Sequence, residues 1–370
     1  MKNYKLMIPG PVDIFDDVRE AMSGPSVAHY GAEWVELYQE TVGLLQQVFQ
    51  TQNDLYLLVG PGTAGLDAAL GNLARTGEKV LILSNGFFGA RLGTIARSYG
   101  LKVVLQEFPQ GQPVETDAVR ARLESERGLQ AVAVVHHETS TGMLNPVGEI
   151  AALAHERDLP VIVDAIASMG GVSVPVDEWG LDVVVTVANK CLETPPGVAP
   201  ISIGQRAWEV MDGKPGRNHG WYLNPETWRE YAKSWADWHP YPTTLPTQNI
   251  MALRVSLQRI LATGLENHYA QYVVAAEKVR AVLHDMGFEL FVPGEHACPL
   301  ITAVKARPEF EVDDLTRFLR EEHSIMIGGG IADLKGKIFR VGHMGRAASD
   351  EYVEAFLDAV RDFLQRRGLG

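Results

Sequence analysis

Val183-Val184-Val185-Thr186-Val187-Ala188-Asn189-Lys190 is a run of β-branched and apolar residues that ends in a lysine. Such a run is typical of a strand that is buried on both faces, as strands of a parallel sheet are. It is followed by Cys191-Leu192-Glu193-Thr194-Pro195-Pro196-Gly197, whose two prolines prevent the chain from continuing as a helix. The sequence therefore predicts a buried strand with the Lys190 amine presented just beyond its end.

A second strand-like run ends in a carboxylate, because Pro160-Val161-Ile162-Val163 leads directly into Asp164. The carboxyl ends of the strands in an open α/β sheet face one crevice, so Asp164 and Lys190 are expected at one edge of the sheet. Taken singly, these residues also fit a surface lysine and a helix-capping aspartate. Together, an amine that can form a Schiff base and a carboxylate that can hold a pyridinium are the minimum that a pyridoxal phosphate (PLP) enzyme needs.

Short apolar runs alternate with amphipathic stretches between about residues 35 and 205. Strands are predicted at 55–59, 79–84, 102–106, 130–135, 160–164, 182–188 and 199–203. Helices are predicted at about 35–50, 64–75, 89–99, 115–126 and 147–157. This alternation indicates an α/β fold with a mainly parallel sheet.

The second half of the chain has a different pattern. Residues 206–247 contain five of the seven tryptophans, four of them at 221–238, and such an aromatic stripe is more typical of packing or a subunit interface than of a cofactor site. A long helical stretch is predicted at about 247–286. The rest is predicted to form an α+β unit, with strands near 288–292, 299–305, 324–327 and 337–341 and a closing helix at 349–367.

The composition excludes several classes of protein. The net charge of -13 argues against nucleic acid or an anionic membrane as a partner, because the long-range field repels both. The only cysteines, Cys191 and Cys298, provide neither a disulfide framework nor the spacing of a zinc site, so no metal is expected. We see no signal peptide and no run near the length of about 18 apolar residues that a spanning helix needs. We expect a cytoplasmic protein.

Gly60-Pro61-Gly62-Thr63-Ala64-Gly65 matches the G-x-G-x-x-G pattern of dinucleotide sites, which follows a strand and opens a helix. Pro61 removes one backbone N–H, and the next predicted strand ends in Ser84-Asn85 without an acidic residue for a ribose. A glycine-rich turn into a helix N-terminus can still bind one phosphate. The motif therefore favours PLP over a nicotinamide cofactor, and an NAD-dependent dehydrogenase is the less favoured alternative.

With these residues, the chain resembles the class V aminotransferases of the fold-type I PLP superfamily, and among them the alanine/serine–glyoxylate (or –pyruvate) aminotransferases. The resemblance extends from Pro9-Gly10-Pro11 to the last predicted helix. Its most specific parts are His137-Glu138-Thr139-Ser140-Thr141-Gly142, Val163-Asp164-Ala165-Ile166-Ala167-Ser168, Ala188-Asn189-Lys190 with Pro195-Pro196-Gly197, and Gly336-Lys337-Ile338-Phe339-Arg340-Val341-Gly342-His343-Met344-Gly345.

The resemblance implies a large domain with a mainly parallel seven-stranded sheet and a smaller α+β C-terminal domain. We predict an N-terminal arm at 1–20 that associates with the small domain, a large PLP-binding domain at 21–255 and the small domain at 256–370. It also implies a homodimer with shared active sites, because in this family the neighbouring subunit completes the phosphate site.

The resemblance further implies roles for individual residues. Lys190 is expected to form the Schiff base and to carry the proton, and Asp164 to pair with the pyridine nitrogen. Arg340 is expected to hold the substrate carboxylate, since a guanidinium matches two carboxylate oxygens at once. The other implied cofactor contacts are Phe88, Ile166 and Thr139 around the ring, Gly62, Thr63 and Asn189 around the phosphate, and Tyr241 and Thr244 from the partner subunit.

The segment that lines the substrate entrance in relatives is Ala28-His29-Tyr30-Gly31, and it lacks an arginine. His29 and Tyr30 are therefore expected to contact substrate, and the preferred side chain of the amino acid stays open. The chain also departs from the family at Pro61, which cannot donate to a phosphate, and at His137, where glycine or cysteine is commoner.

The implied activity is transfer of an amino group from a small L-amino acid, alanine or serine, to glyoxylate or pyruvate. The segments Asn85-Gly86 to Arg91, Thr141–Pro146 and Ala188–Cys191 also resemble 2-aminoethylphosphonate–pyruvate aminotransferases. The region from Arg340 to Gly345, together with Gly328-Gly329-Gly330, is more similar to the glyoxylate branch. A catalytically silent fold-type I protein is a further alternative, against which the combination of Lys190, Asp164 and Arg340 argues.

Overall fold

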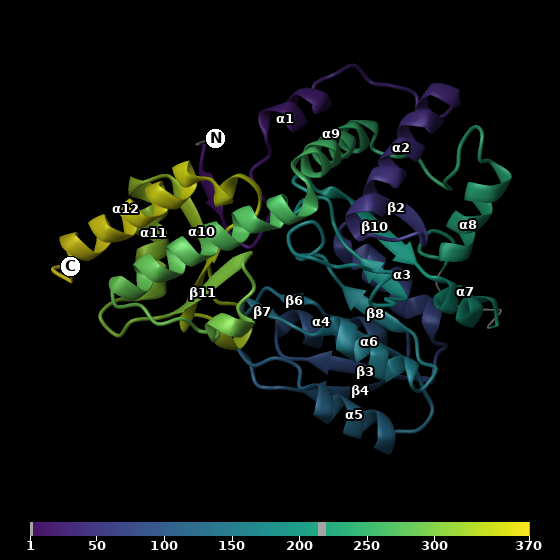
Figure 1. Cartoon of the computed structure of the whole chain (residues 1–370), viewed down its shortest axis with the longest axis horizontal. Coiled ribbons are helices and arrows are strands. Elements are labelled where there is room, and N and C mark those ends of the chain that lie inside the picture. The colour runs from purple at the N-terminus through teal and green to yellow at the C-terminus, as the bar shows by residue number, and fades with distance from the viewer. Residues whose placement is uncertain (1–2, 214–219, 370) are drawn as a thin grey trace.

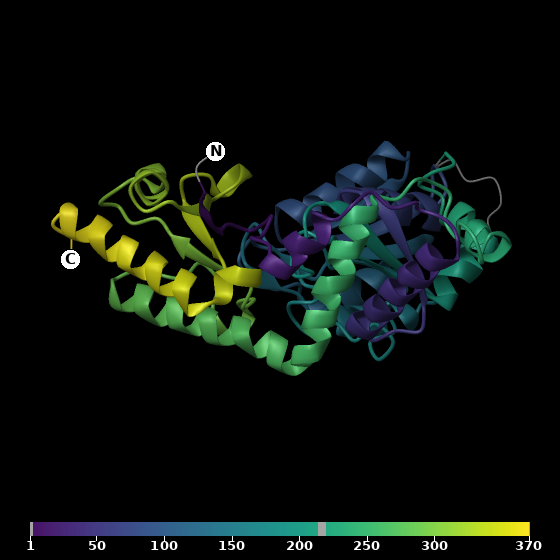
Figure 2. The ribbon, with the colours of Figure 1, turned by 90° about the horizontal axis from the view of Figure 1, so that it is seen from above.

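The computed structural model describes residues 3–213 and 220–369 of the chain. These residues form two lobes, which Figures 1 and 2 show from two directions at right angles. The large lobe contains a seven-stranded sheet and the helices around it. The small lobe contains a four-stranded sheet to which both ends of the chain contribute.

The seven-stranded sheet has the order β2-β10-β9-β8-β5-β3-β4. Its strands are β2 (Asp54–Gly60), β3 (Lys79–Ser84), β4 (Lys102–Glu107), β5 (Leu129–Val135), β8 (Val161–Asp164), β9 (Val183–Val185) and β10 (Gly197–Ile203). Neighbouring strands are parallel except β10, which runs antiparallel to both β2 and β9. The predicted α/β fold with a large, mainly parallel seven-stranded sheet is therefore confirmed.

Helices cover the sheet, so its central strands are buried on both faces. The helices of the large lobe are α2 (Ala32–Phe49), α3 (Gly62–Leu73), α4 (Phe87–Ser98), α5 (Thr116–Ser125), α6 (Val147–His155), α7 (Gln205–Asp212), α8 (Pro225–Ser234) and α9 (Thr247–Thr263). α3 packs on β9 and β10, whereas α4 packs on β3, β4 and β5. All three valines of β9 are fully buried, as expected for a β-branched run in a parallel sheet.

The small lobe has a sheet in the order β1-β12-β13-β11, formed by β1 (Lys5–Met7), β11 (Ile301–Lys305), β12 (Ile325–Gly329) and β13 (Ile338–Gly342). β1 comes from the N-terminal segment and pairs parallel to β12, so the N-terminal and C-terminal parts of the chain both belong to the small lobe in Figures 1 and 2. The helices α10 (Leu265–Asp285), α11 (Val312–Glu322) and α12 (Asp350–Arg366) pack around this sheet. The short helix α1 (Asp16–Met22) leads back to the large lobe, where it packs against α9.

Two details differ from the sequence-based expectations. The long helix expected at about 247–286 is two helices, because Gly264 has a φ of 80° and separates α9 from α10. The strand expected at 288–292 does not form, and only an isolated bridge joins Leu290 to Val304 before Pro293, which has no N–H to donate. The predicted domain boundary at 255–256 falls within α9. The domain boundaries themselves stay predictions.

The contact between α3 and β9 gives a prediction about stability. A Cβ atom on Gly65 would lie 2.5 Å from Val185 Cγ1. Gly65→Ala is therefore expected to reduce the free energy of unfolding by about 1–3 kcal/mol, as overpacking of a core does. Gly43 in α2 is the matched control, because no atom lies within 4 Å of a Cβ built there. Gly43→Ala is expected to stabilise by about 0.5–1 kcal/mol, because alanine favours the helix. Urea unfolding measures both, and equal stabilities would contradict this packing.

Candidate active site

The carboxyl ends of the parallel strands border a cavity of about 520 Å³. Val135, the last residue of β5, pairs with Asp164 in β8, and Asp164 in turn pairs with Val185 in β9. Eight of the predicted site residues line this one cavity: Gly62, Thr63, Phe88, Thr139, Asp164, Ile166, Asn189 and Lys190. Segments that are far apart in the sequence thus meet at the end of the sheet.

Asp164 is a nearly buried carboxylate, 5% exposed, at the end of β8. Its Oδ1 accepts a hydrogen bond from the backbone N–H of Ile166 at 2.9 Å. Burial raises the pKa of Asp164 from 3.8 to about 7, which the Ile166 N–H and the charge of Lys190 oppose. A cation placed against this carboxylate would recover much of the lost solvation, which suits a protonated pyridine nitrogen.

Lys190 lies beyond the end of β9, and its Nζ donates a hydrogen bond to the carbonyl of Pro9. Burial lowers the pKa of Lys190 to about 8; the positive charge of Arg340 adds to this and Asp164 opposes it. A substantial fraction of the amine is therefore neutral near physiological pH, as a nucleophile or a general base requires. Gly10 allows this arrangement, because a Cβ there would lie 2.6 Å from the lysine Nζ.

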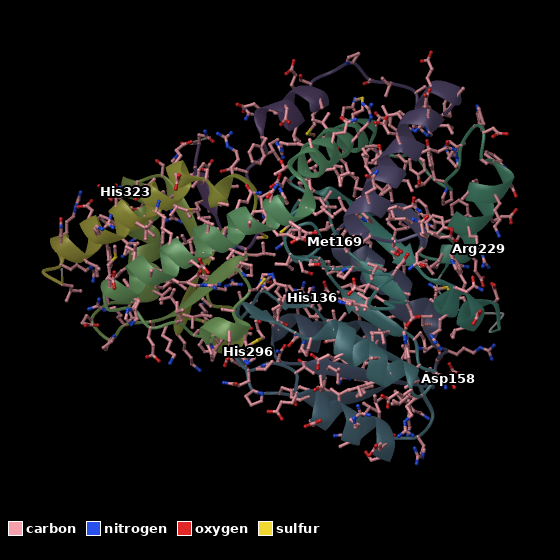
Figure 3. The ribbon with its side chains drawn as sticks, in the orientation of Figure 1. His136, Asp158, Met169, Arg229, His296 and His323 are labelled. Atoms are coloured by element: carbon pink, nitrogen blue, oxygen red, sulfur yellow. The ribbon has the colours of Figure 1, made fainter. Side chains whose placement is uncertain are left out.

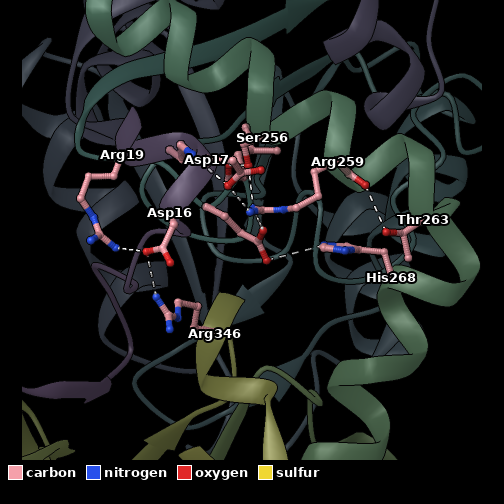
Figure 4. A network of polar contacts seen from close by, with 11 residues as sticks. Asp16, Asp17, Arg19, Ser256, Arg259, Thr263, His268 and Arg346 are labelled. Carbon is pink, nitrogen blue, oxygen red and sulfur yellow. Dashed lines mark hydrogen bonds and ion pairs between the residues drawn. The ribbon is translucent and has the colours of Figure 1, made fainter. Parts of the chain in front are cut away.

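A polar network fixes the segment that follows Lys190. Glu193 is 1% exposed and pairs with Arg259 of α9, with 2.5 Å between Oε2 and Nη2. The hydroxyl of Tyr272 in α10 donates to its other oxygen at 2.7 Å. Arg259 also reaches Asp17 in α1 at 2.9 Å, as Figure 4 shows. The network therefore ties the Lys190 segment to α1, α9 and α10.

The N-terminus of α3 provides a place for an anion. Gly62 and Thr63 are its first residues, and the preceding Pro61 gives it no side-chain cap. N–H groups in the first turn of a helix have no partner within the helix, and its dipole favours negative charge there. Gly62 must lack a side chain, because a Cβ would lie 2.5 Å from Ile166 Cδ1. Asn189 also lines the cavity.

Arg340 is buried in β13, 6% exposed, and does not itself line the cavity. Its Nε and Nη2 donate to the carbonyl of Gly329 at 3.0 and 2.7 Å, and its Nη1 donates to the carbonyl of Thr139 at 2.9 Å. Within the described part of the chain, one N–H thus stays unused on each terminal nitrogen, a pair that can bind a carboxylate. Burial lowers the pKa of Arg340 to about 10, so it is still a cation at neutral pH.

Besides Arg340, four predicted site residues do not line the cavity of this chain: His29, Tyr30, Tyr241 and Thr244. Tyr241 is fully buried, where it accepts a hydrogen bond from Trp34 Nε1 at 2.5 Å and donates to the carbonyl of His29. Thr244 and Tyr30 are exposed, and the Tyr30 ring lies 5.4 Å from that of Trp238. The expectation that a partner subunit brings Tyr241 and Thr244 to the site stays a prediction.

Other cavity residues were not assigned from the sequence. Arg91 lines the cavity with its guanidinium 4.9 Å from the centre of the Phe88 ring, a contact that the i, i+3 spacing in α4 could have suggested. The His137 ring also lines the cavity, with Nδ1 3.3 Å from the carbonyl of Ala167. Burial lowers the pKa of His137 to about 3, so the ring is neutral. Its neighbour His136 instead faces Trp179, and Figure 3 places it near the middle of the molecule.

Comparison with known proteins identifies the family. The model of the family named aminotransferase class-V matches residues 17–354. An uncharacterised aminotransferase of Methanocaldococcus jannaschii is 36% identical over 98% of this chain and 93% of its own. The crystal structure of an alanine–glyoxylate aminotransferase from Nostoc sp. is 32% identical, covers 98% of this chain and 96% of its own, and has a TM-score of 0.94. A pyridoxamine–pyruvate transaminase of Mesorhizobium japonicum is 29% identical over 97% of this chain and 91% of its own. The chain belongs to the class V aminotransferase family.

The chain is therefore an aminotransferase, and the cofactor of its family is PLP. The residues of the cavity fit this group: Asp164 for a pyridine nitrogen, Lys190 for an aldehyde and the first turn of α3 for a phosphate. The alternative of an NAD-dependent dehydrogenase is wrong. Two glycines of the G-x-G-x-x-G pattern have a packing role instead, because a Cβ on Gly62 would clash with Ile166 and a Cβ on Gly65 with Val185 of β9.

Two further observations concern only residues 3–213 and 220–369. No helix among them combines the length and the apolar character that are needed to cross a membrane. They also contain no group of three or more histidine, cysteine, aspartate or glutamate side chains arranged to hold a metal ion.

The pKa of Asp164 gives a prediction about the cofactor-free protein. Because burial raises this pKa from 3.8 to about 7, the stability contributed by the carboxyl is fully present below its unfolded value and lost as pH rises through about 7. Asp164→Asn does not titrate. The variant is expected to melt at a higher temperature than wild type above this pH, with the difference shrinking towards the unfolded pKa. Melting curves across this pH range test it, and parallel curves would contradict it. Added PLP is expected to stabilise wild type more than the variant.

Proposed function

We propose that this chain is a PLP-dependent transaminase that moves an amino group from a small L-amino acid, alanine or serine, to glyoxylate or pyruvate. The observation that carries the proposal is that Lys190 and Asp164 line one cavity. Arg340, with its two unused N–H groups, is hydrogen-bonded to the carbonyl of Thr139, which lines the same cavity. The similarity to the alanine–glyoxylate aminotransferase of Nostoc and to the pyridoxamine–pyruvate transaminase supports the choice of substrates.

Each residue has a defined task in this reaction. PLP, when bound, supplies an electron sink for the bonds at the substrate Cα. Lys190 would hold the cofactor through its aldehyde, and the free Nζ is the base that would take the substrate Cα proton and return it. A pKa of about 8 suits both steps, because the amine must be neutral to accept a proton and basic enough to keep it.

Asp164 and Arg340 are proposed to bind two charged groups, the pyridinium of the cofactor and the carboxylate of the substrate. Asp164 would keep the pyridine nitrogen of the cofactor protonated, and the positive charge of that nitrogen would lower the pKa of the carboxyl again. Arg340 binds the substrate carboxylate through both terminal nitrogens, while its other N–H groups stay bonded to Gly329 and Thr139. The substrate Cα is thereby held at a fixed orientation to Lys190.

The alternative substrate is 2-aminoethylphosphonate, with pyruvate as the acceptor. Besides the sequence resemblance, Arg91 supports it, because its guanidinium lines the cavity, in addition to the guanidinium of Arg340 behind the lining. The Arg91 guanidinium is, however, engaged over the rings of Phe87 and Phe88 at 4.8 and 4.9 Å. We therefore favour an amino-acid donor that needs only Arg340.

We also propose a homodimer in which Tyr241 and Thr244 complete the partner's phosphate site. Tyr30, Trp221, Trp235 and Trp238 are each 45–55% exposed, and of these Tyr30 and Trp235 contact Trp238, which lies near Tyr241 through His239. Exposed aromatic groups of this size are typical of interfaces rather than of solvated surface. Cys191 and Cys298 are both free and buried, which supports the cytoplasmic location that we predict.

The first test is the visible spectrum of the PLP-loaded protein after separate addition of L-alanine, L-serine and 2-aminoethylphosphonate. We expect alanine or serine to bleach the yellow band of lysine-bound PLP, because the amino group moves to the cofactor. Bleaching by the phosphonate alone would show the alternative reaction instead. Lys190→Ala is the control, and it is expected to bind PLP without this band and to lose turnover. A colourless wild-type protein in excess PLP would contradict the proposal.

The proposed dimer predicts that one surface substitution dissociates the subunits. Trp238→Asp places a charge within the exposed aromatic group, so we expect monomers in sedimentation velocity and weaker retention of PLP. Val274→Asp is the matched control, since Val274 is 63% exposed in α10, outside that group. We expect this control to keep the dimer. If Trp238→Asp stays dimeric, the subunit contact lies elsewhere.

A further inference from the structure

Glu138 is a fully buried carboxylate that does not line the cavity. It lies between His137 and Thr139, which do. Burial raises the pKa of Glu138, and hydrogen bonds from Ser140, Phe88 and Gly89 oppose this effect. Buried carboxylates are rare unless they are fully hydrogen-bonded, so the partners of this one indicate what it does.

The partners of Glu138 are the first N–H groups of α4. Its Oε2 accepts from the backbone N–H of Phe88 at 3.0 Å and of Gly89 at 2.9 Å. The preceding N–H, that of Phe87, donates to Ser140 Oγ at 3.1 Å, and this hydroxyl donates to Glu138 Oε1 at 2.5 Å. α4 has no cap from its own N-cap residue, Gly86, so Glu138 of the strand β6 (His137–Glu138) and Ser140 of the turn that follows cap it from a segment far away in the sequence.

The structure around this contact leaves no space for a side chain at Gly86 or Gly89. A Cβ atom on Gly86 would lie 2.5 Å from Glu138 Cγ and 2.6 Å from Ser140 Oγ. A Cβ atom on Gly89 would lie 2.7 Å from the backbone of Ser84. The carboxylate and the helix end are therefore in direct contact, and a displacement of Glu138 moves the first turn of α4.

This turn carries the ring of Phe88, which lines the cavity. On its other side, Glu138 is joined to Thr139, whose carbonyl accepts the hydrogen bond from Arg340 Nη1. The charge of Glu138 also acts on Arg340 and on Asp164, raising the pKa of each. One buried carboxylate thus contacts the elements that present the aromatic ring and the substrate-binding guanidinium.

We propose that Glu138 is a positioning residue that clamps the first turn of α4 and so holds the Phe88 ring against the cofactor. This inference rests on the proposed function, because it assumes that PLP occupies the cavity. A purely structural Glu138 would stabilise the fold without any specific effect on PLP. A positioning role requires that its effect on PLP passes through Phe88.

A double-mutant cycle on the dissociation constant of PLP separates these roles. Glu138→Ala is expected to raise this constant about tenfold, the effect of one charge-assisted contact. Glu138→Gln is expected to raise it less, because the amide oxygen can still accept from the N–H groups of Phe88 and Gly89. In a Phe88→Ala background, Glu138→Ala is expected to add less than about twofold. An equal factor with and without Phe88 would overturn the proposal, and Glu138→Gln permits the same cycle if the alanine variant does not fold.

Asp182 provides the matched control. It is also a nearly buried carboxylate, 5% exposed, and accepts from the N–H of Val161 and from His155 Nε2, both at 2.8 Å. It lies just before the first residue of β9, at the amino ends of the parallel strands, whereas the cavity lies at their carboxyl ends. Asp182→Ala is expected to lower the melting temperature while leaving the dissociation constant of PLP within about twofold of wild type. A similar loss of PLP in both variants would show general destabilisation and overturn the proposal.

The wild-type protein distinguishes failure of this inference from failure of the proposed function. If wild type binds no PLP in equilibrium dialysis, the proposed function fails and the inference fails with it. If wild type binds PLP and responds to an amino donor, but Glu138→Ala binds PLP equally well, only the positioning role is wrong. Amino-donor kinetics give a second readout, because displacement of Thr139 and Arg340 is expected to raise KM more than it lowers kcat.

Discussion

The site depends on the burial of a carboxylate and an amine at one end of a parallel sheet. Neither Asp164 nor Lys190 forms a close ion pair with the other in the described structure, and desolvation brings their pKa values towards each other, to about 7 and about 8. Near neutral pH the carboxyl of Asp164 and the amine of Lys190 are therefore both buried without an opposite charge in close contact. A pyridinium against the carboxylate would supply its counter-charge, and the amine in its neutral form could react with an aldehyde, so part of the stability that is lost in building the site would become affinity for the cofactor.

Two buried groups of this kind must be held in place by their surroundings, and both lobes take part. The N-terminal segment passes between the lobes: Gly10 lies against Lys190, and a Cβ atom on Gly328 or Gly342 of the small lobe would clash with Pro9 or Ile8. On the other side of Lys190, Glu193 is fixed by Arg259 and Tyr272. The amine of Lys190 therefore lies in a chain segment that contacts α9 and α10 directly, and that is linked to α1 through Arg259 and to the small sheet through the N-terminal segment. A change in the position of either lobe would therefore change the surroundings of the Lys190 amine.

Much of this arrangement was predictable from the sequence, for a local reason. Strand ends and the residues just beyond them are recognisable from apolar runs, so Asp164 and Lys190 could be placed at one edge of the sheet. The direction of β10 could not be predicted, because a buried apolar run has the same pattern in either orientation. The role of Glu138 could not be predicted from its motif, because its partners, the backbone N–H groups of α4, lie about fifty residues away and leave no pattern in the side chains. The positions of Tyr241 and Thr244 depend on a second chain, which the pattern of one chain does not describe.

The strand period explains how one short segment serves two purposes. Val135, His137 and Thr139 line the cavity, whereas Glu138 points to the first turn of α4, in keeping with side chains that alternate between the two faces of an extended chain. A shift of one residue would place the carboxylate in the cavity and remove the cap from the helix. The register of this segment is fixed by the pairing of His137 with Leu144 and of Glu138 with Met143, together with the hydrogen bond that Arg340 donates to the carbonyl of Thr139. The register of this segment thus determines which of its side chains line the cavity. It also determines the position of the first turn of α4, because Glu138 binds the N–H groups of that turn.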